Sequence, residues 1–162
     1  MPAASSLFSL ATRTALITGG GSGIGAALAN GLAQSGARVV ICGRRPERLQ
    51  ETAHQINAAL GEVCFPLACD ITDLNAAESI VERATGLAGA APTILINNAG
   101  VNVRQPAADL TAEHWRASLD LMLNAPFFLA RACTPGMAAA KYGRIVNIAS
   151  LQSRLAFPNS IP

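Results

Sequence analysis

The chain has 162 residues, of which 51% are hydrophobic and 14% are charged, and its formal net charge is +2. This length suits one domain with a sizeable core, and so apolar a composition excludes a disordered chain. The twelve basic and ten acidic residues are spread along the sequence. They form no stripe for a polyanion, so we expect no nucleic-acid partner.

The first element is an apolar strand at residues 14–17, followed by a glycine-rich turn at residues 18–25. A helix is expected next, because Ile24, Leu28 and Leu32 have the spacing of one helix face. Glycines allow a positive φ and leave backbone N–H groups accessible at the start of this helix, where the helix dipole favours a pyrophosphate. A glycine turn alone is weak evidence, but the order strand, turn, helix favours a dinucleotide-binding site.

Strands and helices then alternate. Further strands are expected at residues 37–42, 63–69, 93–96 and 143–150. Helices are expected at residues 46–59, from residue 74 to an end among residues 86–92, and from Thr111 through Leu129, with loop in the last twelve residues. Pro66 indicates an edge strand or an irregularity, and Pro126 is expected to kink the last helix. The alternation predicts an α/β fold with a Rossmann-like, doubly wound parallel sheet between two helical layers, in a single domain of residues 1–162.

Ligands bind such sheets at the carboxyl ends of the strands. Five segments of the sequence take that place: the glycine turn, residues 43–45, residues 70–71, residues 97–100 and Ser150. Because parallel strands end at the same edge of a sheet, we expect these segments to lie together.

Four motifs among these segments occur in a recognisable order, TGGGSGIG at 18–25, CDI at 69–71, NNAG at 97–100 and RIVNIAS at 144–150. Together they resemble the short-chain dehydrogenase/reductase family over almost the whole chain. The resemblance implies an oxidoreductase that transfers a hydride between a nicotinamide dinucleotide and a carbonyl or alcohol substrate. It also implies a set of dinucleotide-binding residues: Gly19, Gly21, Ser22, Gly23, Ile24, Gly25, Asp70, Ile71, Asn98, Ala99 and Gly100.

Two strand-end segments have roles that the resemblance makes specific. It implies that Asp70 accepts a hydrogen bond from the adenine amino group, with the backbone at Ile71 helping to hold the ring. A lone Asp before a helix is more often a cap or turn former. Asn97 and Asn98 are expected to steady the sheet and line the floor of the dinucleotide site, although Asn in most loops satisfies turn backbone.

The catalytic residues implied by the resemblance are Asn124 and Ser150. The backbone carbonyl at Asn124 is expected to hold a water of a proton relay, and a tolerated helix amide is the alternative. Ser150 is expected to hydrogen-bond the substrate oxygen and stabilise charge as hydride moves, and a turn hydroxyl is the alternative. Ser153 is expected to serve the loop.

The end of the second strand bears on the choice of dinucleotide. NAD sites of this kind place an Asp or Glu there to bind the ribose hydroxyls, whereas this sequence has Arg44 and Arg45 and no acidic residue before Glu47. An arginine fork matches a 2′-phosphate. NADP(H) is therefore favoured over NAD(H), with solvated arginines at a helix start as the alternative.

The family's acid/base pair, Tyr-x-x-x-Lys, has no counterpart in this sequence. Tyr142 and Lys141 are adjacent and precede the fifth strand, so we expect them to be loop and strand-entry residues. The pair is expected after Pro162, in a longer enzyme that forms a homotetramer, and the chain alone is expected to have negligible turnover, an open sheet edge and marginal stability. The alternative is a non-catalytic dinucleotide-binding or interaction module that ends at Pro162.

The remaining expectations concern location. The four cysteines lack C-x-x-C spacing, which predicts buried free thiols in a reducing compartment and no metal site. Residues 1–12 have no basic leader with an apolar segment, and no apolar run has membrane-spanning length. We therefore expect a cytoplasmic protein without a membrane partner.

Overall fold

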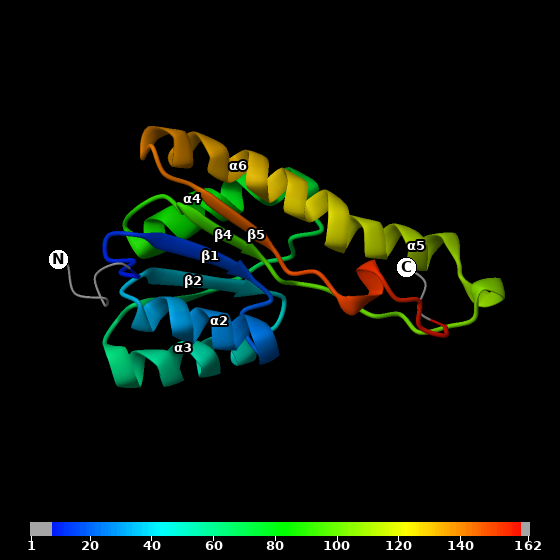
Figure 1. Cartoon of the computed structure of the whole chain (residues 1–162). Coiled ribbons are helices and arrows are strands. Elements are labelled where there is room, and N and C mark those ends of the chain that lie inside the picture. Colours follow the sequence, from blue (N-terminus) through cyan, green and yellow to red (C-terminus); the bar gives the residue numbers. More distant parts are fainter. Residues whose placement is uncertain (1–7, 160–162) are drawn as a thin grey trace.

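The computed structural model describes residues 8–159, and the expectations for residues 1–7 and 160–162 lie outside that range. Its centre is a five-stranded sheet in the order β3-β2-β1-β4-β5, in which all neighbouring strands are parallel (Figure 1). The strands are β1 Thr14–Thr18, β2 Arg38–Gly43, β3 Cys64–Ala68, β4 Ile94–Asn97 and β5 Arg144–Asn147. The predicted α/β fold with a Rossmann-like, doubly wound parallel sheet is confirmed.

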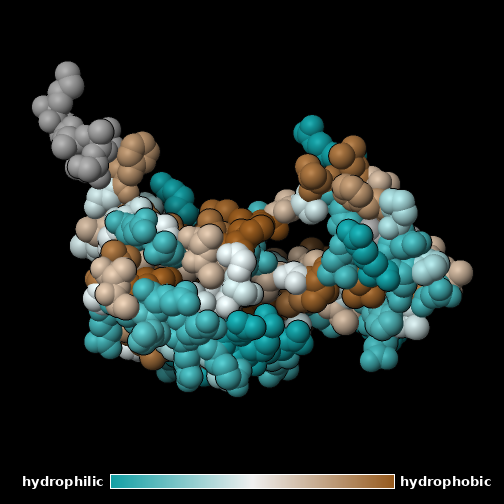
Figure 2. All heavy atoms as spheres, turned by 90° about the horizontal axis from the view of Figure 1, so that it is seen from below, coloured by the Kyte–Doolittle hydropathy of each residue, from teal (hydrophilic) through white to brown (hydrophobic). Residues whose placement is uncertain are grey.

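Helices cover both faces of the sheet (Figure 1). One face carries α2 Gly23–Gln34 and α3 Pro46–Leu60, and the other carries α4 Ala77–Ala88 and α6 Ala125–Ala139. The shorter elements are η1 Leu74–Ala76, η2 Ala107–Asp109, α5 Ala112–Leu119, η3 Asp120–Asn124 and η4 Leu151–Ser153. The arm formed by α5, η3 and α6 extends past the carboxyl ends of the strands, and a hollow with hydrophobic side chains on its walls separates its tip from the sheet (Figure 2).

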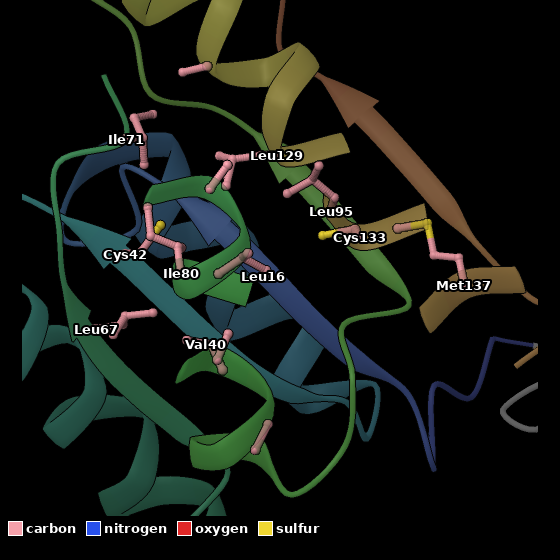
Figure 3. Close-up of a cluster of buried hydrophobic side chains, with 14 residues drawn as sticks. Leu16, Val40, Cys42, Leu67, Ile71, Ile80, Leu95, Leu129, Cys133 and Met137 are labelled. Carbon is pink, nitrogen blue, oxygen red and sulfur yellow. The ribbon is translucent and has the colours of Figure 1, made fainter. Parts of the chain in front are cut away.

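Two hydrophobic cores form because successive strand residues point to opposite faces of the sheet. On the face of α4 and α6, Leu16, Val40 and Leu95 pack against Ile80 and Leu129 (Figure 3). On the other face, the strand residues Ala15, Ile17, Val39 and Ile41 pack in one cluster with Leu49 and Ile56 of α3 and with buried residues of α2. Near-continuous apolar strands such as β1 and β2 are typical of parallel sheets covered on both sides.

Two of the three residues on the expected apolar face of α2, Leu28 and Leu32, pack against the core, whereas Ile24 does not. Ile24 is 63% exposed, and Leu28 and Leu32 are only partly buried, whereas the buried positions are Gly25, Ala29 and Ala33. These small residues let the helix backbone approach β1 closely. A Cβ atom at Gly25 would overlap the carbonyl oxygen of Gly19, so a larger residue does not fit there.

Pro66 lies in β3, which is an edge strand of the sheet, as its missing N–H predicts. The start of β3 is held by Asn57 of α3. The side chain of Asn57 accepts hydrogen bonds from the N–H groups of Val63 and Cys64 at 3.1 and 2.8 Å and donates to the Cys64 carbonyl at 2.8 Å. The start of this edge strand is therefore fixed to α3.

A π-helical segment lies just before Pro126, the residue at which a kink is expected. Thr111 caps α5 by accepting the N–H of His114 at 3.2 Å, as expected. The chain then widens into η3 before α6 begins, with Pro126 in the first turn of α6. Because Pro126 has no N–H to donate to the preceding turn, the wider turn accommodates it.

The opposite edge of the sheet, β5, is open to solvent. All four of its residues are exposed, and within residues 8–159 it pairs only with β4. Phe127 and Leu123 on the nearby helical arm are 63% and 60% exposed. None of the helices described combines the length and apolar character needed to cross a bilayer.

Candidate functional site

A cavity of about 680 Å³ lies at the carboxyl ends of β1, β2, β3 and β4. It brings together most of the predicted dinucleotide-binding residues, which come from four loops: Gly19, Gly21, Ser22, Arg44, Arg45, Asp70, Ile71, Asn98, Ala99 and Gly100. Gly23, Ile24 and Gly25 are not among the residues that line it. They form the first turn of α2, where backbone N–H groups have no partner within the helix and are available to an anion.

The glycine turn has room for backbone only. Gly19 has a φ of +68° and donates its N–H to the Cys42 carbonyl at 2.8 Å. A Cβ atom at Gly20 would lie 2.5 Å from that of Ile41, and one at Gly25 would meet the Gly19 carbonyl. The turn is therefore a shallow surface of amides that a phosphate group can approach closely, which is the shape a dinucleotide requires.

Thr18 and Asn98 fix this turn to the sheet. Thr18 Oγ1 accepts the N–H groups of Asn98 and Ala99, each at 3.0 Å. Asn98 Nδ2 donates to the carbonyls of Thr18 and Gly19 at 3.0 and 3.4 Å. The role of Thr18 was missed from the sequence, although its place as first residue of the glycine motif was the available signal.

Asp70 takes part in a turn and still has acceptor capacity. Its Oδ1 accepts the N–H of Thr72 at 2.9 Å and the hydroxyl of Thr72 at 2.7 Å. These hydrogen bonds, backbone first, lower the pKa of Asp70 below its ordinary value. Desolvation raises it by less, and the charge of Arg44 adds a still smaller lowering. Asp70 is therefore ionised at neutral pH, and its second oxygen can accept a hydrogen bond from a ligand.

Three arginines stand around the cavity. Arg44 and Arg45 lie at the end of β2 and the start of α3, and Arg48 follows one helical turn later. Arg48 was not predicted as a site residue. Its position in the first turn of the expected helix, four residues after Arg44, was the available signal. It also pairs with Glu51 at 3.3 Å on the surface. Asp70 is the sole acidic residue on the wall among the described residues, so the wall is basic.

The predicted catalytic residues lie outside this cavity. Asn124 is in η3, and its Nδ2 donates to Asp120 Oδ1 at 2.8 Å. Ser150 follows β5, is exposed, and accepts the N–H of Gln152 at 3.3 Å, so its hydroxyl also caps η4. Neither Asn124 nor Ser150 lines the dinucleotide cavity, and their catalytic roles stay predictions.

A second cavity of about 460 Å³ lies between the ends of β4 and β5 and the helical arm. Asn98, Ala99 and Gly100 line both cavities, so this loop separates the two. Asn97 Nδ2 donates to Asn147 Oδ1 at 2.8 Å, while Asn97 Oδ1 is buried without a partner in the part of the chain that the structure describes.

Tyr142 and Lys141 precede β5, as expected. The Tyr142 ring lies between two guanidinium groups, with the carbon of Arg13 3.8 Å and that of Arg144 4.5 Å from its centre. These contacts are at the amino ends of β1 and β5, whereas the cavities are at the carboxyl ends. Neither Tyr142 nor Lys141 is part of the candidate site.

Comparison with known proteins identifies the family. The model of the short chain dehydrogenase family matches residues 13–162. Gluconate 5-dehydrogenase of Gluconobacter oxydans (strain 621H) is 39% identical over 159 residues, which are 96% of this chain and 60% of that protein.

Solved structures give the same result. A gluconate 5-dehydrogenase from Burkholderia cenocepacia J2315, in complex with NADP and tartrate, has a TM-score of 0.87 and 35% identity, over 98% of this chain and 61% of that one. L-sorbose reductase from Gluconobacter frateurii, complexed with NADPH and L-sorbose, has a TM-score of 0.85 and 33% identity, over 91% and 56%. The chain spans about 60% of the length of the curated relative. This chain belongs to the short-chain dehydrogenase family.

Proposed function

We propose that the chain binds NADP(H) as part of an oxidoreductase that moves a hydride between this dinucleotide and a carbonyl or alcohol substrate. The observation that carries the proposal is the glycine turn, whose Gly19 and Gly21 line the cavity and where Cβ atoms at Gly20 and Gly25 would overlap their neighbours. The family membership supports the same activity.

The residues present fit the dinucleotide. Backbone N–H groups at Gly23, Ile24 and Gly25 would hold the pyrophosphate at the start of α2. The carboxylate of Asp70 would accept the adenine amino group, and Ala99 and Gly100 would form the floor beneath the ribose. NADP(H), when bound, supplies or accepts the hydride of the reaction.

The preference for NADP(H) over NAD(H) is supported by Arg44, Arg45 and Arg48 on the cavity wall. Guanidinium groups bind phosphate with charge-assisted hydrogen bonds, whereas the ribose hydroxyls of NAD require an acceptor. The relatives from B. cenocepacia and G. frateurii were solved with NADP and NADPH.

The substrate side of the proposal rests on the second cavity and on Ser150. Ser150 would hydrogen-bond the substrate oxygen, and the backbone carbonyl at Asn124 would hold a water for proton transfer. Because Tyr142 and Lys141 lie at the opposite end of the sheet, we propose that the acid/base comes from another part of the whole protein. Relatives named for gluconate and L-sorbose make these two compounds the first substrates to test.

Two broader expectations belong to the same proposal. The four cysteines are free, which supports a reducing, cytoplasmic location. The exposed side chains of Phe127 and Leu123 on the helical arm support association of the whole protein into a homotetramer.

The test is a titration of the full chain with NADPH and with NADH, followed by nicotinamide fluorescence, and then a turnover assay of the whole protein with gluconate and L-sorbose. We expect NADPH to bind more tightly than NADH and turnover to follow with at least one carbonyl or alcohol. Absence of NADPH binding would overturn the proposal. Binding without turnover on a broad carbonyl panel would favour a non-catalytic dinucleotide-binding module.

A further inference from the structure

Two cysteines share the wall of the large cavity. Cys42 is in β2 and Cys69 follows β3, its neighbour in the sheet. The register pairs Gly43 with Ala68, and the N–H of Cys69 donates to the Gly43 carbonyl at 2.9 Å. Both side chains belong to the cluster on the α4 and α6 face, where Figure 3 labels Cys42. The two thiols therefore lie beside each other across adjacent strands.

The surroundings give the two thiols different reactivity. Cys69 is partly buried and its pKa is lowered, first by the thiol of Cys42 and then by the charge of Arg83 and the backbone of Gly43. Cys42 is fully buried, and the neighbouring Cys69 together with burial raises its pKa. The thiolate is the nucleophilic form of cysteine, so Cys69 is the accessible nucleophile of the pair. Cys42 is the buried thiol next to it.

The other two cysteines provide a contrast within the same chain. Cys64 lies in the cluster on the opposite face of the sheet, and burial raises its pKa to about 11. Cys133 lies in α6, and burial raises its pKa to about 12. Neither lines the large cavity. Of the four cysteines, we therefore expect the pair at the ends of β2 and β3 to react with oxidants.

We propose that Cys42 and Cys69 form an oxidation site that hydroperoxides convert to a disulfide. The Cys69 thiolate attacks one peroxide oxygen, the O–O bond breaks, and the released oxygen takes a proton to leave as water or an alcohol. Cys69 is then a sulfenic acid. The Cys42 sulfur attacks that sulfur, the S–O bond breaks, and the hydroxide leaves as water with the Cys42 proton. Both sulfurs are oxidised and the peroxide is reduced.

The position of the pair connects this oxidation with ligand binding. Cys69 immediately precedes Asp70, and Cys42 precedes Gly43 and Arg44, all on the cavity wall. A covalent bond between the ends of β2 and β3 would draw these segments together. If the cavity holds NADP(H) as proposed above, the disulfide weakens binding, and bound dinucleotide shields Cys69 from the oxidant.

The test uses the full chain treated with hydrogen peroxide, alkylated, digested with trypsin and analysed by mass spectrometry without reductant. Cys42 lies in the tryptic fragment 39–44, and Cys69 lies in the fragment 49–83 together with Cys64. We therefore include the variant Cys64→Ser. In this variant, a disulfide between the two fragments can join only Cys42 and Cys69. The expected result is that linked pair, with the loss of two hydrogens, in wild type and in this variant.

Controls separate the pair from general thiol oxidation. Cys133, in the fragment 132–141, should stay reduced and alkylated throughout. The variant Cys69→Ser should form no link, and Cys42→Ala should leave a sulfenic acid on Cys69 that dimedone traps. A peroxide-treated wild-type chain in which Cys42 remains fully alkylated would overturn the proposal, as would a link through Cys64 or Cys133. The wild-type measurement decides even if a variant folds poorly.

A second arm adds NADPH before the peroxide. At about ten times its dissociation constant, NADPH should slow disulfide formation roughly tenfold, because only the unbound fraction reacts. A disulfide that forms in the free chain supports the oxidation site irrespective of this arm. If NADPH binds elsewhere, so that its addition leaves the rate unchanged, the proposed dinucleotide site fails while the thiol pair stands.

Discussion

Thr18 and Asn98 are joined by two hydrogen bonds, both donated by Asn98 and accepted by Thr18. Thr18 Oγ1 accepts the N–H of Asn98 at 3.0 Å, and Asn98 Nδ2 donates to the Thr18 carbonyl at 3.0 Å. One residue ends β1 and the other follows β4, so the pair closes the gap where two parallel strands diverge. The glycine turn begins directly after Thr18, and its orientation depends on this connection.

Removing the Thr18 hydroxyl should therefore destabilise the protein. In Thr18→Val, a substitution of similar shape, the N–H groups of Asn98 and Ala99 lose their acceptor. We expect the free energy of unfolding in urea to fall by about 1–3 kcal/mol, the range for a buried polar group left unpaired. Thr93→Val is the matched control, because the buried Thr93 hydroxyl makes only one long contact, 3.5 Å to the Thr14 carbonyl. Equal losses in the two variants would contradict the prediction.

Two glycines of α2 should respond oppositely to alanine. Gly25→Ala places a Cβ atom against the Gly19 carbonyl and should cost about 1–3 kcal/mol of stability and weaken NADPH binding. Gly31→Ala meets nothing within 4 Å and should raise stability by about 0.5–1 kcal/mol, because alanine favours a helix more than glycine does. Thermal unfolding and NADPH titration measure both effects. A stable Gly25→Ala variant with full NADPH affinity would show that the turn is looser than described.

The arginines on the cavity wall should distinguish the two nicotinamide dinucleotides. In Arg44→Ala and Arg45→Ala, we expect the dissociation constant for NADPH to rise about tenfold for each residue, at the low end of charge-assisted hydrogen bonds because both side chains are exposed. NADH binding should change little. Arg116→Ala, an exposed arginine of α5, is the control for a general loss of positive charge. Equal effects on NADPH and NADH would remove the argument for a 2′-phosphate.

Asp70 should make the free energy of unfolding depend on pH in the acid range. Its pKa in the folded protein is below the ordinary value of 3.8, chiefly because Thr72 donates to it. A carboxylate with a lowered folded-state pKa stabilises the protein above the ordinary value, and this contribution disappears as the pH falls through the folded-state pKa. Urea unfolding of wild type should therefore show a loss between neutral pH and acid pH that is smaller in Asp70→Asn.

Thr72→Val offers a second measurement of the same effect. It removes the hydroxyl donor at 2.7 Å but keeps the backbone donor, so the pKa of Asp70 should rise towards its ordinary value and the acid-dependent loss should shrink without vanishing. If wild type and both variants lose stability in parallel between neutral and acid pH, other carboxylates determine the acid response.

The sheet was well predicted from the sequence because its strands are short and apolar. The segments between them have apolar residues at the interval of one helix face, so strands and helices could be told apart. The missing N–H of Pro66 also predicted the edge position of β3, which the strand order confirms. Hydrophobic spacing found part of the packing face of α2 in Leu28 and Leu32, but it also marked Ile24, which is exposed, whereas close packing on β1 selects Gly25. The periodicity of a sequence reveals large apolar side chains. It does not reveal where two backbones approach so closely that only a small residue fits between them.

Most residues of the site were predicted from the sequence, whereas the hydrogen bonds between them were not. Residues from four loops were expected at one edge, and the structure places most of them around one cavity. The connection between Asn98 and Thr18 could not be predicted, because it depends on how two strand ends separated by 80 positions meet in space. The π-helical segment before Pro126 was also missed, because a change in hydrogen-bond spacing leaves no pattern in side-chain polarity.

The small residues along α2 have a consequence for protein engineering. Ala29 and Ala33 are buried, and the helix that carries them also presents its first turn to the cavity. A bulkier residue at either position would lift the whole helix from β1 and displace its amide end with it. Affinity for a phosphate ligand can therefore be lowered by volume added at a distance, in a variant whose ligand-contacting residues are all unchanged.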